Sequence, residues 1–265
     1  MLDYTATQAI TEFVKMCMVS CEAYLESKGL QFILNYPSNF KFSLIIFDVS
    51  MGSCLYPLLH RFDYPPAVAV TPFLLPPYVA YNFGNLLNPS YTPWYNLPYS
   101  HEMTFMQRVW NSAHMYTEII LRNVKLYKDE HEKTKQIFGE VPPMEVLERH
   151  FSLLLTNTNP ILNGPQPLAP NVIAVGGLHT RKPSQVPQDL LTILDGATNG
   201  VILFSLGTNI RSDQIDHKAR KAVLDAFSKI KETVIWKFES TIDGLPKNVI
   251  VREWLPQNDI LGLFL

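Results

Sequence analysis

The sequence has little net charge and few cysteines. Lysine and arginine total 22 and aspartate and glutamate total 24, so the formal net charge is −2. A nearly neutral chain has no general electrostatic attraction to nucleic acid, and we expect no nucleic-acid partner. The cysteines, at 17, 21 and 54, number three. An odd count does not give a disulfide framework, so the cellular compartment stays open.

The sequence also lacks long apolar runs and metal-binding spacings. The stretch nearest to a membrane-spanning helix, 65–81, is interrupted by five prolines. The first thirty residues carry scattered charges and no apolar signal-peptide segment, so we expect neither a targeting nor a transmembrane segment. The seven histidines show no metal spacing. Cys17 and Cys21 are expected to be small buried or half-buried side chains, and no metal site is predicted.

The composition is that of a globular protein with two domains. Hydrophobic residues make up 47 % and charged residues 17 % of 265 positions, which supplies ample apolar material for a core. Helical spacing of apolar residues predicts helices, and short continuous apolar runs predict buried parallel strands. In the first part of the chain, the predicted helices are 5–29, 51–61 and 105–139, and the predicted strands are 42–47, 67–70, 151–156 and 171–176.

Two further stretches are not predicted to form regular helices or strands. Residues 71–100, rich in proline and aromatic side chains, are expected to form an ordered loop. Residues 179–190 are polar and contain prolines, as a linker would. A second α/β domain then opens near residue 190. It has predicted strands at 200–204, 233–237 and 248–251 and a predicted helix at 216–231.

The turn Ser205-Leu-Gly-Thr208 follows a predicted strand and precedes a helix. Its glycine permits a tight turn, and hydroxyl groups and turn amides can bind phosphate oxygens. The competing interpretation is ordinary turn chemistry, which the same pattern forms in many α/β proteins. Spacing alone favours the ordinary turn.

The segment Trp254-Leu-Pro-Gln-Asn258 follows the last predicted strand. A tryptophan offers a flat face on which a base can stack, and Gln257 and Asn258 can hydrogen-bond to a base or a ribose. The competing interpretation is a core tryptophan followed by a proline turn and a helix cap. The pattern alone favours the core tryptophan.

Asp48 ends the predicted strand 42–47. Ligands in open α/β sheets bind outside the carboxyl ends of the strands, where a carboxylate can orient a histidine. The competing interpretation is an N-cap for a helix beginning near Met51, and the pattern alone favours it.

Together these segments resemble the UDP-glycosyltransferases, the family that includes the glucuronosyltransferases of animals, in an invertebrate-like form. Four stretches carry the resemblance, and the last two together are highly specific. They are Lys41 to Asp48, Val175 to His179, Gly200 to Thr208, and Leu245 to Val249 running into Trp254 to Gly262. The match runs from about residue 5 to residue 262.

The resemblance implies a GT-B-like α/β fold with two Rossmann-like domains, both incomplete here. It implies a partial acceptor-binding domain at 1–178, a linker at 179–190 and a partial UDP-sugar-binding domain at 191–265. The implied reaction transfers glucose or glucuronic acid from a UDP-sugar to a hydroxyl of a small lipophilic acceptor, with inversion. The UDP-sugar is a co-substrate, and no cofactor is implied. Detoxification is the implied role.

The resemblance also implies roles for particular residues. Asp48 matches the aspartate that steers the family's catalytic histidine. Ser205, Gly207 and Thr208 match the turn on the phosphate side. Trp254 matches the residue that stacks on uracil, and Gln257 and Asn258 match the polar pair beside it.

The departures from the family pattern shape the remaining expectations. The family's catalytic histidine lies upstream of the segment matched here, and its diphosphate-binding signature lies downstream of Gly262. We therefore expect a fragment truncated at both ends that is inactive alone. The alternative is a non-catalytic isoform that acts as a binding or dimerisation module with full-length relatives. The family implies the lumenal side of the endoplasmic reticulum membrane, with attachment through segments absent here.

Overall fold

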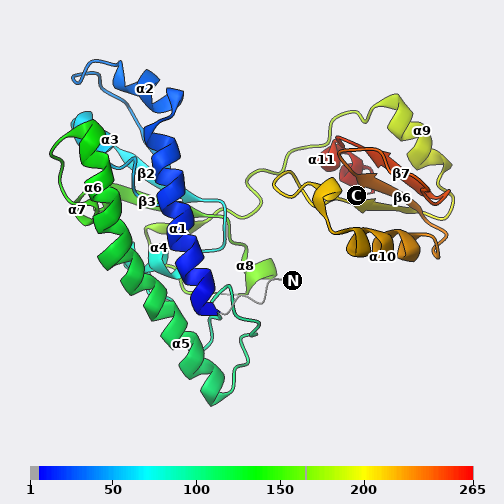
Figure 1. Cartoon of the computed structure of the whole chain (residues 1–265), viewed down its shortest axis with the longest axis horizontal. Helices are drawn as coiled ribbons and strands as arrows, with labels where there is room; N and C mark the ends of the chain where they lie inside the picture. The colour runs from blue at the N-terminus through cyan, green and yellow to red at the C-terminus, as the bar shows by residue number, and fades with distance from the viewer. Residues whose placement is uncertain (1–5, 165, 265) are drawn as a thin grey trace. The chain divides into compact units, whose positions relative to one another are not determined.

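The computed structural model describes residues 6–164 and 166–264. The chain divides into two compact units, Met1–Leu178 and His179–Leu265, and each is described by itself. Each unit has a parallel sheet with helices packed against it, as Figure 1 shows. The α/β class predicted from the sequence is therefore confirmed.

The sheet of the first unit has four parallel strands in the order β1-β2-β3-β4. They are β1 (Ile45–Asp48), β2 (Ala67–Thr71), β3 (Phe151–Thr156) and β4 (Val172–Ala174). All four were predicted, but β1 begins at Ile45 and not at position 42. The reason is that Phe42 packs edge-on against Phe40 and Phe62 in an aromatic cluster before the strand begins.

The two long helices predicted for the first unit differ in detail from those observed. The predicted helix 5–29 forms α1 (Ala6–Leu25), and its expected first residue, at position 5, lies outside the described residues. A separate helix α2 (Lys28–Leu34) follows, because the Ser27 hydroxyl accepts a hydrogen bond from the Leu30 amide at 3.1 Å and caps a new start. The predicted helix 105–139 is α5 (Phe105–Ile120), a π-helical segment η1 (Leu121–Leu126) and α6 (Tyr127–Phe138).

The shorter helices were predicted less well. The helix expected from Met51 begins only at Pro57, as α3 (Pro57–Arg61). The stretch 71–100, expected to be a loop, contains α4 (Pro77–Asn82), which starts with proline in the first turn, where its missing N–H costs nothing. The remaining short helices of this unit are α7 (Met144–Glu148) and α8 (Pro160–Asn163).

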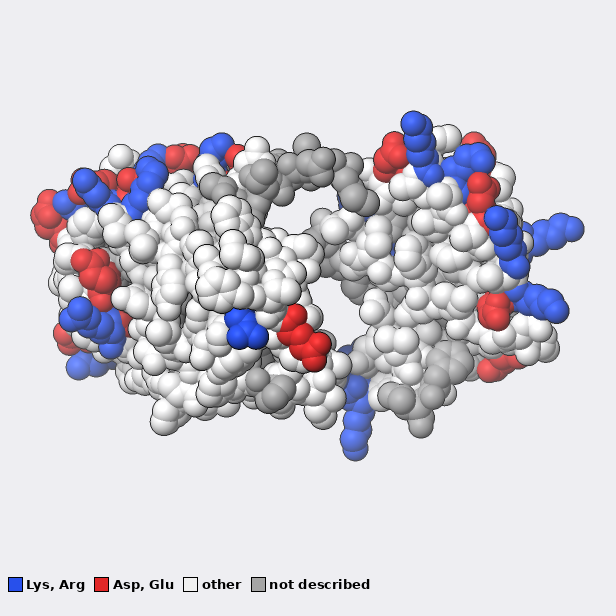
Figure 2. Space-filling view, turned by 90° about the horizontal axis from the view of Figure 1, so that it is seen from below, with Lys and Arg blue, Asp and Glu red and all other residues white. Residues whose placement is uncertain are grey.

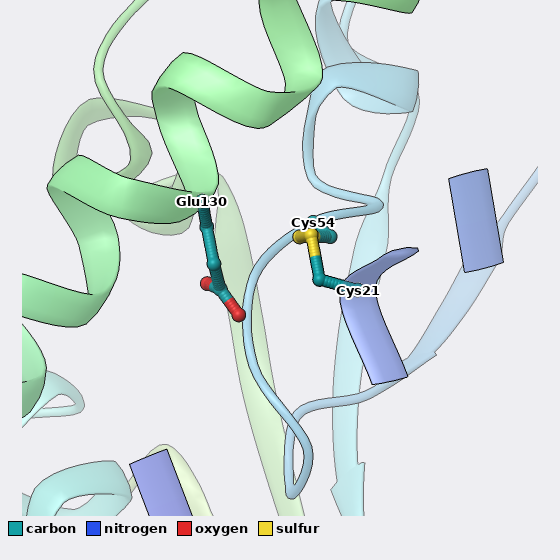
Figure 3. A group of neighbouring side chains, drawn as sticks. All are labelled: Cys21, Cys54 and Glu130. Atoms are coloured by element: carbon teal, nitrogen blue, oxygen red, sulfur yellow. A yellow bond between two sulfur atoms is a disulfide. The ribbon is translucent and has the colours of Figure 1, made fainter. Parts of the chain in front are cut away.

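A disulfide joins Cys21 in α1 to Cys54 in the segment after β1, with the two Cα atoms 5.5 Å apart (Figure 3). The odd count of cysteines did not predict this bond, and Cys21 was expected only to be a small buried or half-buried side chain. The pair lies 33 residues apart in sequence, so only the packing of α1 on the sheet brings the sulfurs together. Glu130 of α6 lies beside them and accepts a 2.8 Å hydrogen bond from the Ser53 amide. Cys17 is a free, buried thiol.

The second unit has a three-stranded parallel sheet in the order β5-β6-β7. Its strands are β5 (Val201–Phe204), β6 (Thr233–Lys237) and β7 (Val249–Arg252), and its helices are α9 (Gln188–Gly196), η2 (Ser212–Gln214), α10 (His217–Phe227), α11 (Gln257–Leu261) and η3 (Gly262–Phe264). Alternate side chains of β6 serve two cores, since Ile235 packs with α9 and α11 whereas Trp236 packs with α10. The range expected to be linker, 179–190, includes the start of α9, and Val186 and Leu190 belong to the core.

None of the helices in the described part of the chain combines the length and the apolar character that crossing a bilayer requires.

Candidate functional site

Three segments of the second unit meet at the carboxyl edge of its sheet. Ser205 follows β5, Lys237 ends β6, and Trp254 lies just after the end of β7. The strands are parallel and Phe204 pairs with Trp236, so these three residues leave the sheet at one edge. They line a cavity of about 250 Å³. Its lining residues are Arg181, Ser205, Gly207, Thr208, Lys237, Trp254, Leu255, Pro256, Gln257 and Asn258.

The Ser205 turn has the conformation that its glycine makes accessible. Gly207 has φ +84°, in the left-handed region that residues with a Cβ rarely adopt. Its amide donates a 3.1 Å hydrogen bond to the Ser205 hydroxyl. Ser205 is half-buried, whereas Gly207 and Thr208 are exposed. The turn therefore presents polar groups toward the cavity.

Trp254 is held at the cavity with most of its surface open. Its exposed fraction is 68 %, whereas the next residue, Leu255, is 4 % exposed and anchors the segment in the core. The competing interpretation of Trp254 as a core side chain is wrong, since the tryptophan of this core is Trp236, which is fully buried. An exposed indole at a cavity is free to stack on a planar ligand.

Gln257 and Asn258 form the start of α11. Asn258 is partly committed, because its Nδ2 donates to the carbonyl oxygen of Arg181 at 3.2 Å. The neighbouring Asp259 pairs with Arg181 at 2.8 Å and accepts a 2.7 Å hydrogen bond from the Ser184 amide. The hydrogen bond from Arg181 lowers the pKa of Asp259. These contacts fasten residues 181–184 to α11.

The sequence interpretation missed two cationic residues of the cavity, Arg181 and Lys237. Lys237 forms a 2.5 Å ion pair with Glu239, and both side chains are largely buried. The hydrogen bond from Lys237 lowers the pKa of Glu239, which also accepts from the Ser212 amide at 2.7 Å. A single lysine at a strand end forms no motif. The signal that the sequence offers is the position of Lys237 at the end of the predicted strand 233–237.

Asp48 is the last residue of β1 and is exposed. Its carboxylate accepts a 2.9 Å hydrogen bond from the Ser50 amide. The competing interpretation as a helix N-cap does not hold, because the next helix begins at Pro57. The position at the carboxyl end of a parallel strand is the predicted one. No contact in the described residues tests the predicted catalytic role.

A second, apolar cavity lies beside this strand end in the first unit. Its volume is about 350 Å³, and Ser50 lines it. The Tyr78 hydroxyl donates to the Ser50 carbonyl oxygen at 2.8 Å, which connects the cavity wall to the turn that follows Asp48. The remaining lining residues are Phe13, Phe73, Leu74, Leu75, Pro76, Pro77, Leu87, Thr92, Pro93, Tyr95 and Gln166.

The described residues that line this cavity are uncharged, and charged groups lie behind them. Glu118 accepts hydrogen bonds from the Tyr95 hydroxyl and, at 2.6 Å, from the Trp94 indole. Burial raises the pKa of Glu118. The Arg122 guanidinium lies 3.3 Å from the centre of the Tyr78 ring. Figure 2 shows a broad area of uncharged side chains on one face of this unit, with charged ones gathered toward its edge.

The two parallel sheets, with a polar cavity at the carboxyl edge of one, define a class of α/β proteins that bind ligands at strand ends. The chain belongs to the family "UDP-glucoronosyl and UDP-glucosyl transferase", whose model matches residues 3–263. The GT-B-like class implied by the resemblance is thereby confirmed, and the chain is of a glycosyltransferase family.

Individual relatives agree with this membership. The chain is 33 % identical to "UDP-glycosyltransferase UGT5" of Dactylopius coccus over 85 % of its length and 43 % of the relative's. It is 34 % identical to human "UDP-glucuronosyltransferase 1A7" over 65 % of its length and 32 % of the relative's. The chain thus spans less than half the length of these relatives. A solved glycosyltransferase of kitacinnamycin covers 97 % of this chain and 57 % of its own, at 12 % identity and a TM-score of 0.47.

Proposed function

We propose that this chain provides substrate-binding parts of a UDP-glycosyltransferase. The enzyme transfers glucose or glucuronic acid from a UDP-sugar to a hydroxyl of a small lipophilic acceptor, with the UDP-sugar as co-substrate and no further cofactor. The observation that carries this proposal is the convergence of the Ser205 turn and the Trp254 indole on one cavity.

The donor binds in the cavity of the second unit. Its uracil stacks on Trp254, which is 68 % exposed there, and Gln257 contacts the base or ribose. The phosphates lie toward Ser205, Gly207 and Thr208, where hydroxyl groups and turn amides can donate hydrogen bonds to phosphate oxygens. Asn258, already bonded to the Arg181 carbonyl oxygen, contributes by shaping the cavity wall.

The acceptor binds in the apolar cavity of the first unit. Its lining is aromatic and aliphatic apart from Ser50, Thr92, Gln166 and the hydroxyl groups of two tyrosines. The Tyr78 hydroxyl donates to the Ser50 carbonyl oxygen, and the Tyr95 hydroxyl donates to Glu118. Such a lining suits an uncharged molecule with a hydroxyl at one end. Small lipophilic phenols have this chemistry, and their glycosylation is a detoxification reaction.

The transfer is a direct displacement. The acceptor oxygen forms a bond to the anomeric carbon while the bond from that carbon to the UDP oxygen breaks, and the acceptor proton passes to a base. We propose Asp48, at the strand end beside Ser50, as the carboxylate that orients that base and stabilises its charged form.

The disulfide supports a location in an oxidising compartment. Disulfides persist in secreted proteins and in the lumen of the endoplasmic reticulum and are rare in the cytosol. The bond between Cys21 and Cys54 therefore favours the lumenal side of the endoplasmic reticulum, which the family resemblance implies.

The proposed donor site is tested by calorimetric titration of the chain with UDP, ADP and GDP. We expect UDP to bind at least about tenfold more tightly than either purine nucleotide. The reason is that the cavity fits the smaller pyrimidine base and that Gln257 hydrogen-bonds to it. Equal affinity for all three nucleotides would contradict a UDP-sugar site.

A further inference from the structure

Lys237 lines the donor cavity. It ends β6, the middle strand, and its register partner in β7 is Arg252. The neighbouring strand β5 ends at Phe204, opposite Trp236, so Ser205 begins its turn beside Lys237. Trp254 follows on the other side. A side chain at this position lies between the polar turn and the stacking face.

The cavity lining carries charge of one sign. Arg181 and Lys237 line it, whereas their carboxylate partners, Asp259 and Glu239, are not among the lining residues. Arg181 makes two contacts to Asp259 and a 2.7 Å hydrogen bond to Ser184, so its guanidinium serves to fasten the segment. Lys237 has one ion-pair partner among the described residues, and an ammonium group has three donors.

The Lys237 ammonium is also shielded from water. Its side chain is 11 % exposed and that of Glu239 is 10 % exposed. A charged donor in such surroundings binds an anion more strongly than one at an open surface. Glu239 additionally accepts from the Ser212 amide at 2.7 Å, which ties the lysine to the end of the loop that starts at Ser205.

We propose that Lys237 binds the diphosphate of the nucleotide-sugar donor, and that Glu239 is the positioning residue that holds the ammonium toward the Ser205 turn. This assignment rests on the proposed function. It deepens that function by adding a cation to the phosphate end of the site, where the Ser205 turn offers neutral donors only. The diphosphate carries the negative charge of UDP, and Lys237 is a cation in the lining of the cavity that we propose for the donor.

The test is calorimetric titration of the chain with uridine and with UDP in four variants. They are Lys237→Met, Lys237→Arg, Glu239→Gln and the double change Lys237→Met with Glu239→Gln. Lys247→Met is the matched control, because Lys247 is exposed and precedes β7 at the opposite edge of the sheet. Uridine has no phosphate, so its binding reports whether the cavity is folded.

We expect Lys237→Met to weaken UDP binding about tenfold to a hundredfold and to leave uridine binding unchanged. Lys237→Arg retains most of the UDP affinity, and Lys247→Met retains all of it. Glu239→Gln weakens UDP binding by a smaller factor than Lys237→Met and leaves uridine binding unchanged, because the glutamine oxygen can still accept from the ammonium but holds it less firmly than a carboxylate does. The double change does not restore UDP binding, whereas a lysine that only neutralised Glu239 would allow full restoration.

Each contrary outcome has a distinct meaning. Unchanged UDP affinity in Lys237→Met, full restoration in the double variant, or equal losses for uridine and UDP would overturn the role of Lys237 while the donor site stands. Failure of the unaltered chain to bind either uridine or UDP would overturn the proposed function itself.

Discussion

Two tryptophans of the second unit have opposite surroundings. Trp236 is fully buried against Phe204, Phe227 and Phe238, whereas Trp254 exposes 68 % of its surface at the donor cavity. One indole is therefore part of the core, and most of the other is not covered by other side chains. The exposed face of Trp254 is therefore available to a planar ligand.

Trp254→Ala is expected to weaken binding of both uridine and UDP by about tenfold or more, since stacking of a base on an aromatic side chain contributes about 1–3 kcal/mol. Isothermal titration calorimetry measures both affinities. Trp110→Ala is the control, because Trp110 is 54 % exposed in α5 of the other unit. Equal affinities in the Trp254 variant and the unaltered chain would contradict base stacking.

Glu148 makes the stability of the first unit depend on pH. It accepts a 2.9 Å hydrogen bond from the Tyr127 hydroxyl, and burial raises its pKa from 4.5 to about 7. The folded state therefore favours the protonated carboxyl. The resulting stabilisation is present below pH 4.5 and is lost as the pH rises through about 7.

Glu148→Gln removes this titration while keeping a carbonyl oxygen to accept from Tyr127. We expect the free energy of unfolding of the unaltered chain to fall relative to the variant by up to roughly 3 kcal/mol between pH 4.5 and about pH 8. Urea denaturation of both proteins at several pH values measures the difference. Glu118 and Glu130, whose pKa values are also raised by burial, titrate in both proteins and cancel. If the free energies of unfolding of the two proteins changed with pH in parallel, the raised pKa of Glu148 would be contradicted.

At the scale of elements, strands were easier to predict than helix boundaries. The strands of both sheets are continuous apolar runs, and β6 was predicted with its observed bounds. The break at Ser27 depends on a local cap, and the π-helical turn at Leu121–Leu126 depends on tertiary packing that buries Arg122 against Tyr78. Helical periodicity contains neither piece of information, so both boundaries were missed.

The disulfide between α1 and the segment after β1 is expected to stabilise the first unit by about 2–4 kcal/mol, mainly by restricting the unfolded chain. A reducing agent should lower the melting temperature of the unaltered chain. Cys54→Ser should melt at the lower temperature with or without the reductant. Cys17→Ser should keep the sensitivity to reductant, since Cys17 is a free thiol. A melting temperature insensitive to reduction would contradict the pairing.

At the scale of the whole molecule, the division into Met1–Leu178 and His179–Leu265 suggests two cooperative units. We expect calorimetry to resolve two unfolding transitions. UDP should raise the midpoint temperature of the second unit's transition and leave that of the first unit unchanged, because a ligand stabilises the unit that binds it. A single transition, or a shift of both by UDP, would show that the units do not unfold independently.

The candidate site was predictable where a motif carried it and not where the fold assembled it. Ser205, Gly207, Thr208, Trp254 and Gln257 were named from two short sequence motifs, and the structure places them around one cavity. Arg181 and Lys237 come from segments without a motif. Their presence there depends on strand order and on the Asp259 ion pair, which only the folded unit reveals.

The central claim is that the carboxyl edge of the second sheet binds the UDP part of a sugar donor. The most direct measurement is titration of isotopically labelled chain with UDP, followed by backbone amide chemical shifts in NMR spectra. The account predicts that the largest shifts occur at Ser205–Thr208, Lys237 and Trp254–Asn258. Shifts centred on the apolar cavity of the first unit, or no shifts at millimolar UDP, would contradict it.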